Sequence, residues 1–270
     1  MNKTIQTVNK KNFTYNLTYS SNAKFYYPKN YHEIKKILTF LKKTKQKALI
    51  KSGKCGYGDK TNLQRCKTII SLINLDKIIK FQREKKIIKV QAGIYLYELL
   101  FFLQKKGYAI YNIPGGKKVS LGGAIAGNVH GRPANENYAT FGDNIISLKV
   151  MLEDGNIKKI RRKNKLFNKF IGGLGLFGII LEADIKVFKI YYNYYEEITT
   201  LIKSKKSFND YQKKLNYCVG IINFFKLNSF EGKFYKFIGQ KKADNRKIIN
   251  SKKNTIFDII NFFKIPTVIS

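Results

Sequence analysis

The chain has 270 residues, and its 52 Lys and Arg against 17 Asp and Glu give a formal charge of +35. Apolar residues make up 44% of the sequence, which supports packed cores and excludes a wholly disordered chain. Only six basic residues are arginine, the lysines are spread along the chain, and no nucleic-acid recognition motif accompanies them. The charge therefore does not favour a nucleic-acid-binding protein, which we keep only as a minor alternative.

The first predicted element is an amphipathic helix that follows Pro28. Asn30 and Glu33 have the spacing of a capping pair at its start. Its apolar positions recur with helical spacing and are Ile34, Ile37, Leu38 and Leu41. A short strand, Ala48 to Ile50, then leads into a glycine-rich loop over residues 53–59.

Two further strands are predicted at Thr68 to Leu72 and at Ile87 to Gln91. A second amphipathic helix follows, with Gly107 as its C-terminal cap. Its apolar face consists of Leu96, Leu99, Leu100 and Leu103. The region from Pro114 to Gly131 is the richest in glycine, and we expect it to form a loop.

An Asp-Gly turn predicts a β-hairpin between Ile145 to Leu152 and Asn156 to Arg161. A third glycine cluster, residues 172–178, precedes a β-rich run from Ile179 to Ile190. Beyond this run the sequence is rich in Lys and Asn, with short helix and strand pieces. Together these elements predict an α+β fold with mixed or antiparallel strands.

The three glycine clusters bear on ligand binding, because glycine lets the backbone approach a ligand and peptide N–H groups can bind an anion. Each cluster alone is equally consistent with tight turns, but three beside β-rich runs favour a phosphate-bearing cofactor. Gly173 to Gly178 matches G-x-G-x-x-G, yet a strand-like run follows where the Rossmann fingerprint requires a helix. The sequence has neither a P-loop nor a G-x-S-x-G nucleophile elbow.

Histidine and cysteine are scarce, which limits the chemistry further. We expect His32 on the exposed surface of the first helix. His130 lies in the glycine-rich region, where a bulky side chain is unusual unless it faces a cavity, so it is a candidate for a ligand-facing role. Cys55, Cys66 and Cys218 form no C-x-x-C pair, so neither a disulfide framework nor a metal site is predicted.

In combination, these segments resemble the PCMH-type FAD-binding domain of the vanillyl-alcohol-oxidase superfamily, nearest to its decaprenylphosphoryl-β-D-ribose 2′-oxidase branch. The resemblance extends from about Tyr26 to Phe188, with agreement in the order and spacing of the motifs. It rests on Tyr57-Gly58-Asp59, Pro114-Gly115, Gly122 to Ala126, Val129-His130-Gly131, Phe141-Gly142 and Gly172 to Ile180. It implies a PCMH-type FAD-binding domain of two α+β subdomains over residues 1–188, followed from residue 189 by an α+β substrate domain.

The resemblance also implies where FAD binds. The first loop would wrap the diphosphate, and the second segment would lie along the flavin and the rest of the dinucleotide. The implied FAD-binding residues are Gly53, Lys54, Cys55, Gly56, Tyr57, Gly58, Asp59, Gly115, Ser120, Leu121, Gly122, Gly123, Gly127, Asn128, Val129, His130 and, in the third segment, Ile179 or Ile180. Tyr57 and His130 would border the substrate side of the flavin, whereas no catalytic base is assigned.

Two departures from the family pattern affect these expectations. Many superfamily members have a flavin-linked histidine where this chain has Cys55, but the ribose-oxidase branch binds FAD without a covalent bond. We therefore expect non-covalent FAD, with a cysteinyl link as a minor alternative. The family's substrate domain is also much longer than the segment after Phe188, so residues 189–270 are expected to be the start of a truncated substrate domain.

The resemblance implies an FAD-dependent oxidoreductase that oxidises a CH–OH group of a sugar, an alditol or a polyprenyl-phosphate sugar by hydride transfer to flavin N5. The same branch implies a partner reductase. The alternative is an FAD-binding remnant or half-enzyme that needs another chain to supply the cap. Because we find no signal-peptide pattern and no apolar run long enough for a membrane span, we expect a cytoplasmic protein, with peripheral membrane contact left open.

Overall fold

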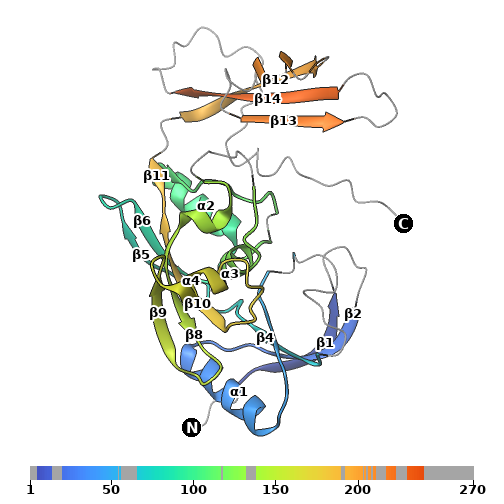
Figure 1. Ribbon diagram of the computed structural model, residues 1–270, viewed down its shortest axis with the longest axis vertical. Helices are drawn as coiled ribbons and strands as arrows, with labels where there is room; N and C mark the ends of the chain where they lie inside the picture. The colour runs from blue at the N-terminus through green and yellow to red at the C-terminus, as the bar shows by residue number, and fades with distance from the viewer. Residues whose placement is uncertain are drawn as a thin grey trace. The chain divides into compact units, whose positions relative to one another are not determined.

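The structure, a computed structural model, divides into two compact units, Met1–Phe188 and Lys189–Ser270 (Figure 1). It describes residues 5–13, 20–53, 55, 66–116, 118–131, 138–189, 192–202, 204, 206–207, 209–210, 217–222 and 230–239. Both units combine strands in mixed or antiparallel sheets, and among the described residues the helices lie in the first unit apart from short pieces. The predicted α+β fold class is confirmed.

The first sheet of the first unit has the strand order β1-β2-β4-β3. Its strands are β1 (Thr7–Phe13), β2 (Ser20–Tyr26), β3 (Leu49–Lys51) and β4 (Thr68–Ser71). β1 and β2 are antiparallel, whereas β4 runs parallel to both β2 and β3. Three strands therefore share one carboxyl-terminal edge.

Helix α1 (Tyr31–Lys43) confirms the first predicted helix and its cap. The Glu33 N–H donates to Asn30 Oδ1 at 2.9 Å, and the Lys29 N–H donates to Glu33 Oε2 at 2.7 Å. The first bond satisfies a backbone donor that a helix start leaves unpaired, and the second fixes the residue before the cap. The buried face of α1 packs in one apolar cluster with β4 and the second sheet, and its members from α1 are Ile34, Ile37 and Leu41.

The second sheet is antiparallel, with the order β5-β6-β10-β8-β9. Its strands are β5 (Ile78–Gln82), β6 (Ile87–Gln91), β8 (Ile145–Met151), β9 (Ile157–Arg161) and β10 (Ile179–Lys186). β8 and β9 form the predicted hairpin, and Gly155 in its turn has a φ of +79°, which glycine adopts without the penalty of a Cβ atom. β10 follows the third glycine cluster directly, which confirms that this cluster is not a Rossmann fingerprint.

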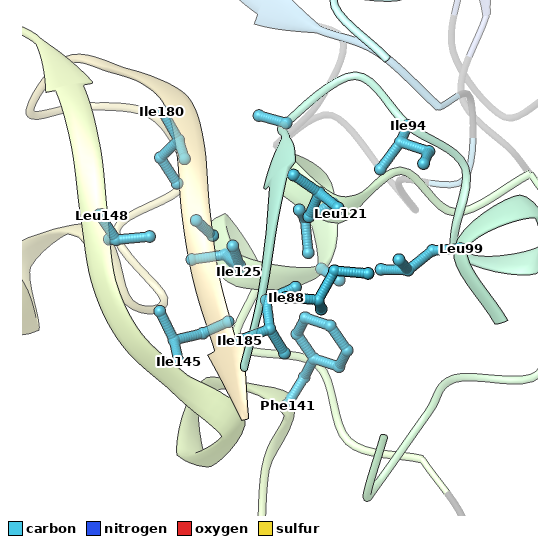
Figure 2. Packing of buried hydrophobic residues seen from close by; sticks show 14 of the residues in the cluster. Ile88, Ile94, Leu99, Leu121, Ile125, Phe141, Ile145, Leu148, Ile180 and Ile185 are labelled. Atoms are coloured by element: carbon cyan, nitrogen blue, oxygen red, sulfur yellow. The ribbon is translucent and has the colours of Figure 1, made fainter. Parts of the chain in front are cut away.

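Three short helical elements and one longer helix pack against this sheet. They are α2 (Leu96–Lys105), α3 (Leu121–Ala126), the 3₁₀ helix Phe141–Asn144 and α4 (Lys165–Phe170). α2 confirms the second predicted helix, whereas α3 forms within the region expected to be a loop. Figure 2 shows Leu121 and Ile125 of α3 among buried side chains of β6, β8 and β10.

The remaining strands are short or belong to the second unit. β7 (Tyr108–Ala109) and β11 (Phe188–Lys189) each have two residues. In the second unit, β12 (Tyr192–Ile202), β14 (Phe230–Gly239) and β13 (Tyr217–Ile222) form an antiparallel sheet in that order. Ile256, Ile259, Ile260 and Phe263 recur with the spacing of an amphipathic helix, which the sequence predicts there, but this segment lies outside the described residues. Among the described helices, none has the length and apolar character that crossing a membrane requires.

Candidate functional site

Three segments far apart in sequence line one cleft of the first unit. They are the end of β3 that leads into the first glycine loop, helix α3, and the third glycine cluster with the start of β10. The cleft is lined by Ile50, Lys51, Ser52, Leu72, Gly122, Gly123, Ala126, Leu174, Gly175, Gly178 and Ile180. It lies at the carboxyl ends of the parallel strands β3 and β4, the end of a parallel sheet at which ligands commonly bind.

Two glycines at the cleft are required by packing within the protein itself. A Cβ atom on Gly53 would lie 2.1 Å from the carbonyl oxygen of Lys118 and 2.6 Å from the Ser120 nitrogen. A Cβ atom on Gly122 would lie 3.1 Å from the carbonyl oxygen of Ala92, to which the Gly122 N–H donates at 2.8 Å. The first and second segments are therefore in backbone contact, and the second is fixed against the end of β6.

The peptide N–H groups at the start of α3 all have acceptors within the protein. Ser120 is 2% exposed, and its Oγ accepts the Gly123 N–H at 3.3 Å. The Leu121 N–H donates to the Ile94 carbonyl at 2.9 Å, and the Leu121 side chain is fully buried in the core. Together with the Gly122 bond, these contacts leave no free N–H among the first three residues of α3 for a diphosphate.

Gly123 differs from its neighbour Gly122 because it is exposed at the cleft. A Cβ atom on Gly123 would meet only Ser120 Oγ, at 3.1 Å, among atoms within 4 Å. No protein backbone therefore explains the glycine at this position. The open surface in front of Gly123 fits a flat ring system that lies against the helix backbone.

Ser52 supplies a polar group that has no partner in the protein. Its Oγ is the one buried side-chain oxygen or nitrogen without a hydrogen bond in the described part of the chain. An unpaired buried hydroxyl costs about 1–3 kcal/mol, so an atom of this kind at a cleft is available to pair with a ligand or a water molecule. Sequence reasoning began the first loop at Gly53 and missed Ser52, since only the folded structure shows that its hydroxyl is unpaired.

The alternation of β10 separates the two isoleucines of the third segment. Ile180 lines the cleft, whereas Ile179 is buried in the cluster that contains the α1 face. This follows because successive side chains of a strand point to opposite faces. Of the two, Ile180 is the residue placed to contact a ligand.

The remaining candidates of the second segment do not line this cleft. Asn128 Oδ1 accepts the Gly142 N–H at 3.1 Å, so it ties the segment to the 3₁₀ helix. Val129 packs against the core, and His130, Gly115 and Gly127 are exposed. In the first loop, the predicted residues Lys54, Gly56, Tyr57, Gly58 and Asp59 lie outside the described residues.

A buried asparagine that sequence reasoning missed holds the backbone beside His130. Asn112 is 1% exposed and has a φ of +55°, a left-handed conformation in which asparagine is over-represented. Its Oδ1 accepts the Gly131 N–H, and its Nδ2 donates to the Tyr138 carbonyl at 2.6 Å. Asn112 therefore joins the chain on both sides of residues 132–137.

Cys55 occupies a half-buried position beside Lys118. Burial raises the pKa of its thiol, and the charge and backbone of Lys118 oppose that shift only in part. The thiol is therefore protonated at neutral pH and is a weak nucleophile. Among the described residues, no group of three or more His, Cys, Asp or Glu could hold a metal ion.

Residues 23–161, half of the chain, match the family model of an FAD binding domain. The chain belongs to this FAD-binding domain family. FAD is thus its cofactor, and the PCMH-type resemblance is confirmed. The unpaired Ser52 hydroxyl and the open backbone at Gly123 both fit such a dinucleotide.

The chain is also similar to part of several larger proteins. A putative D-arabinono-1,4-lactone oxidase of Neurospora crassa is 27% identical over 161 residues, which are 59% of this chain and 28% of that protein. A D-lactate dehydrogenase of Anaerostipes hadrus is 32% identical over 126 residues, 44% of this chain and 26% of that protein. A decaprenylphosphoryl-beta-D-ribose oxidase of Mycolicibacterium smegmatis is 28% identical over 122 residues, which are 44% of this chain and 26% of that protein. The matched part thus spans about a quarter of the length of these relatives.

Proposed function

We propose that this chain is the FAD-binding part of an oxidoreductase that oxidises a CH–OH group of a sugar, an alditol or a polyprenyl-phosphate sugar. The observation that carries the proposal is the cleft in which the end of β3, the open face of α3 and the third glycine cluster meet. The substrate class is supported by relatives named as a lactone oxidase, a lactate dehydrogenase and a ribose oxidase. Residues 1–188 are assigned to the FAD-binding domain and residues 189–270 to the start of a substrate domain, which the division into two units supports.

Bound FAD would supply the acceptor for the hydride, and the protein's residues bind and orient it. The contact between Gly53 and Lys118 fixes the end of β3 against the second segment. Ile180 contributes an apolar wall, and Gly123 leaves room for a ring against the backbone. Asn112 fixes the peptide next to His130, which with Tyr57 is our candidate for the substrate side.

Release of the cofactor tests the proposal directly. Purified protein, reconstituted with flavin where necessary, is precipitated with acid, and the supernatant is analysed by chromatography and mass spectrometry. We expect one FAD per chain in the supernatant, because the protonated Cys55 thiol does not favour a covalent bond. Yellow colour in the pellet would contradict non-covalent binding, and a folded sample that takes up no FAD would contradict the proposal.

The alternative is a half-enzyme that needs another chain. An assay of substrate oxidation by the isolated chain distinguishes it from an enzyme that is active alone. The chain is assayed with an artificial electron acceptor and a panel of sugars and alditols. We expect FAD binding with little oxidation, because the matched relatives are several times longer than the matched segment. Turnover of the order of 1–10³ per second by the isolated chain would show that no further segment is needed.

A further inference from the structure

We propose that the Ser52 hydroxyl donates a hydrogen bond to a phosphate oxygen of the FAD diphosphate. The inference rests on the proposed function, because it assigns a residue to the binding of that cofactor. Its starting point is the buried Ser52 Oγ, which lines the cleft and has no partner in the described protein.

The position of Ser52 is fixed on both sides by backbone contacts. On its N-terminal side, the Leu72 N–H donates to the Lys51 carbonyl at 2.9 Å and extends the pairing of β3 with β4. On its C-terminal side, Gly53 packs against the backbone of Lys118 and Ser120. The hydroxyl is therefore held at the carboxyl end of a parallel strand and cannot leave the cleft without breaking these contacts.

The other polar groups at this end of the cleft are already occupied. The Lys51 ammonium donates to Asn12 Oδ1 at 2.5 Å and to the Phe13 carbonyl at 2.9 Å. The remaining described lining consists of glycine and apolar residues, without a carboxylate. A ligand group that pairs with Ser52 is thus not opposed by a negative charge of the lining.

A phosphate oxygen is the ligand group that best suits this hydroxyl. A serine hydroxyl has one O–H donor, and hydrogen bonds to an ionised acceptor are the strong ones. The N–H groups at the start of α3, which bind anions at many helix N-termini, are all paired within the protein here. The diphosphate must therefore find donors elsewhere, and Ser52 is the described side chain that has one to offer.

The test compares Ser52→Ala with Ser71→Ala. Ser71 is 6% exposed and is paired in register with Lys51 on the neighbouring strand, but it does not line the cleft. Both variants are expressed as the full chain, stripped of flavin, and titrated with FAD and with riboflavin, which lacks phosphate. Thermal unfolding of each apoprotein is measured in parallel.

We expect Ser52→Ala to weaken FAD binding about tenfold, as loss of one hydrogen bond to a charged group predicts. Its affinity for riboflavin should match that of the unmodified chain, and Ser71→Ala should bind FAD normally. The Ser52→Ala apoprotein should melt at the same temperature or about 2–4 °C higher, because an unpaired buried hydroxyl has been removed. A variant that binds FAD more weakly while its apoprotein is no less stable identifies a hydroxyl that serves ligand binding and not the fold.

Three results would overturn the inference. Equal FAD affinity of Ser52→Ala and the unmodified chain would exclude the hydrogen bond while leaving FAD binding intact. A lower melting temperature of the Ser52→Ala apoprotein would indicate a structural role. An equal loss of riboflavin affinity would place the hydroxyl at the flavin instead of the phosphate. Failure of the unmodified chain to bind FAD would instead contradict the proposed function.

Discussion

The cleft proposed to bind FAD differs in the pairing of its polar groups from the charged face of the second sheet, which carries Lys89, Lys149, Lys159, Glu182 and Asp184. On the charged face, Glu182 Oε1 accepts the Tyr31 hydroxyl at 2.8 Å and lies 2.9 Å from Lys149 Nζ. On the same face, Lys159 and Lys89 lie 3.4 and 3.9 Å from the carboxylate of Asp184. At the cleft, Ser52 has a buried hydroxyl with no partner, and a Cβ atom on the exposed Gly123 would meet only a side-chain hydroxyl, that of Ser120.

The difference separates groups that stabilise the fold from groups that, in our proposal, bind the cofactor. The polar groups of the charged face pair within the protein, and the bonds of Tyr31 to Glu182 and Gln91 hold α1 to the second sheet. The cleft instead carries the energetic cost of an unpaired group, which a bound cofactor would remove. Substitutions on the charged face should change stability and leave FAD affinity unchanged, and substitutions of open cleft residues should do the reverse.

The largest expected effect is at Gly123. In Gly123→Val, the side chain meets only the Ser120 hydroxyl but occupies the space proposed for the cofactor, so FAD affinity should fall at least 100-fold. The apoprotein should keep its fold, because valine has a somewhat higher helix propensity than glycine and the added Cβ atom meets only the Ser120 hydroxyl. The measurements are FAD titration and chemical denaturation of the apoprotein.

Gly122→Val is the matched comparison, one residue earlier on the same helix. Its side chain would press on Ala92 at the end of β6, so the apoprotein itself should lose about 1–3 kcal/mol of stability. If Gly123→Val bound FAD normally, the open face of α3 would not be the cofactor surface. If both variants unfolded to the same extent, the distinction between the two glycines would be wrong.

The second prediction concerns the charged face. Glu182→Gln should lower the free energy of unfolding by about 1–3 kcal/mol, because the buried carboxylate accepts bonds from Tyr31 and Lys149. The value lies below that of a fully buried ion pair since the Lys149 side chain is 37% exposed. FAD affinity of the folded variant should not change. The same substitution at the exposed Glu84 serves as the control, and equal stabilities of the two variants would contradict the prediction.

Periodic elements could be predicted from sequence because local pattern determines them. The apolar spacing of α1 and α2 and the Asp-Gly turn of the β8–β9 hairpin gave elements that the structure confirms. β1 was missed because most of its side chains are exposed. β2 does alternate, with Ala23 and Phe25 buried beside the exposed Lys24, but this alternation covers only a few residues after a polar segment. α3 was missed because glycine disfavours helices, and contacts with Ala92 and the Ser120 cap override that preference.

The candidate site could be predicted by segment but not by residue. The order of the glycine motifs located three segments, and the cleft is lined by residues of the second and third segments and by Ile50 to Ser52, which directly precede the first. The motifs could not tell Gly122, which packs on the backbone of Ala92, from Gly123, which is exposed and packs on no backbone. Nor could the motifs identify Asn112, which bonds to Tyr138 far along the chain, or Ser52, whose hydroxyl has no partner in the protein.

The smallest expected effect is a pH dependence carried by Tyr31 on the charged face. Burial raises the pKa of Tyr31 to about 12, the Glu182 carboxylate adds to the shift, and the hydrogen bond from Gln91 opposes it. In the unfolded chain the phenol loses its proton near pH 10. Between pH 10 and 12 the folded state therefore binds more protons than the unfolded state, so stability falls as pH rises.

Tyr31→Phe removes this titration and tests the assignment. Denaturation of both proteins at several pH values should show a steeper fall between pH 10 and 12 for the unmodified chain than for Tyr31→Phe. The difference should be modest because the tyrosine is only about half buried. Below pH 9 the stability difference between the two should stay constant, and FAD affinity should be equal, since Tyr31 does not line the cleft. Parallel pH profiles of stability throughout would show that folding does not change the pKa of the Tyr31 phenol. A loss of FAD affinity in Tyr31→Phe would contradict the separation of the charged face from the cleft.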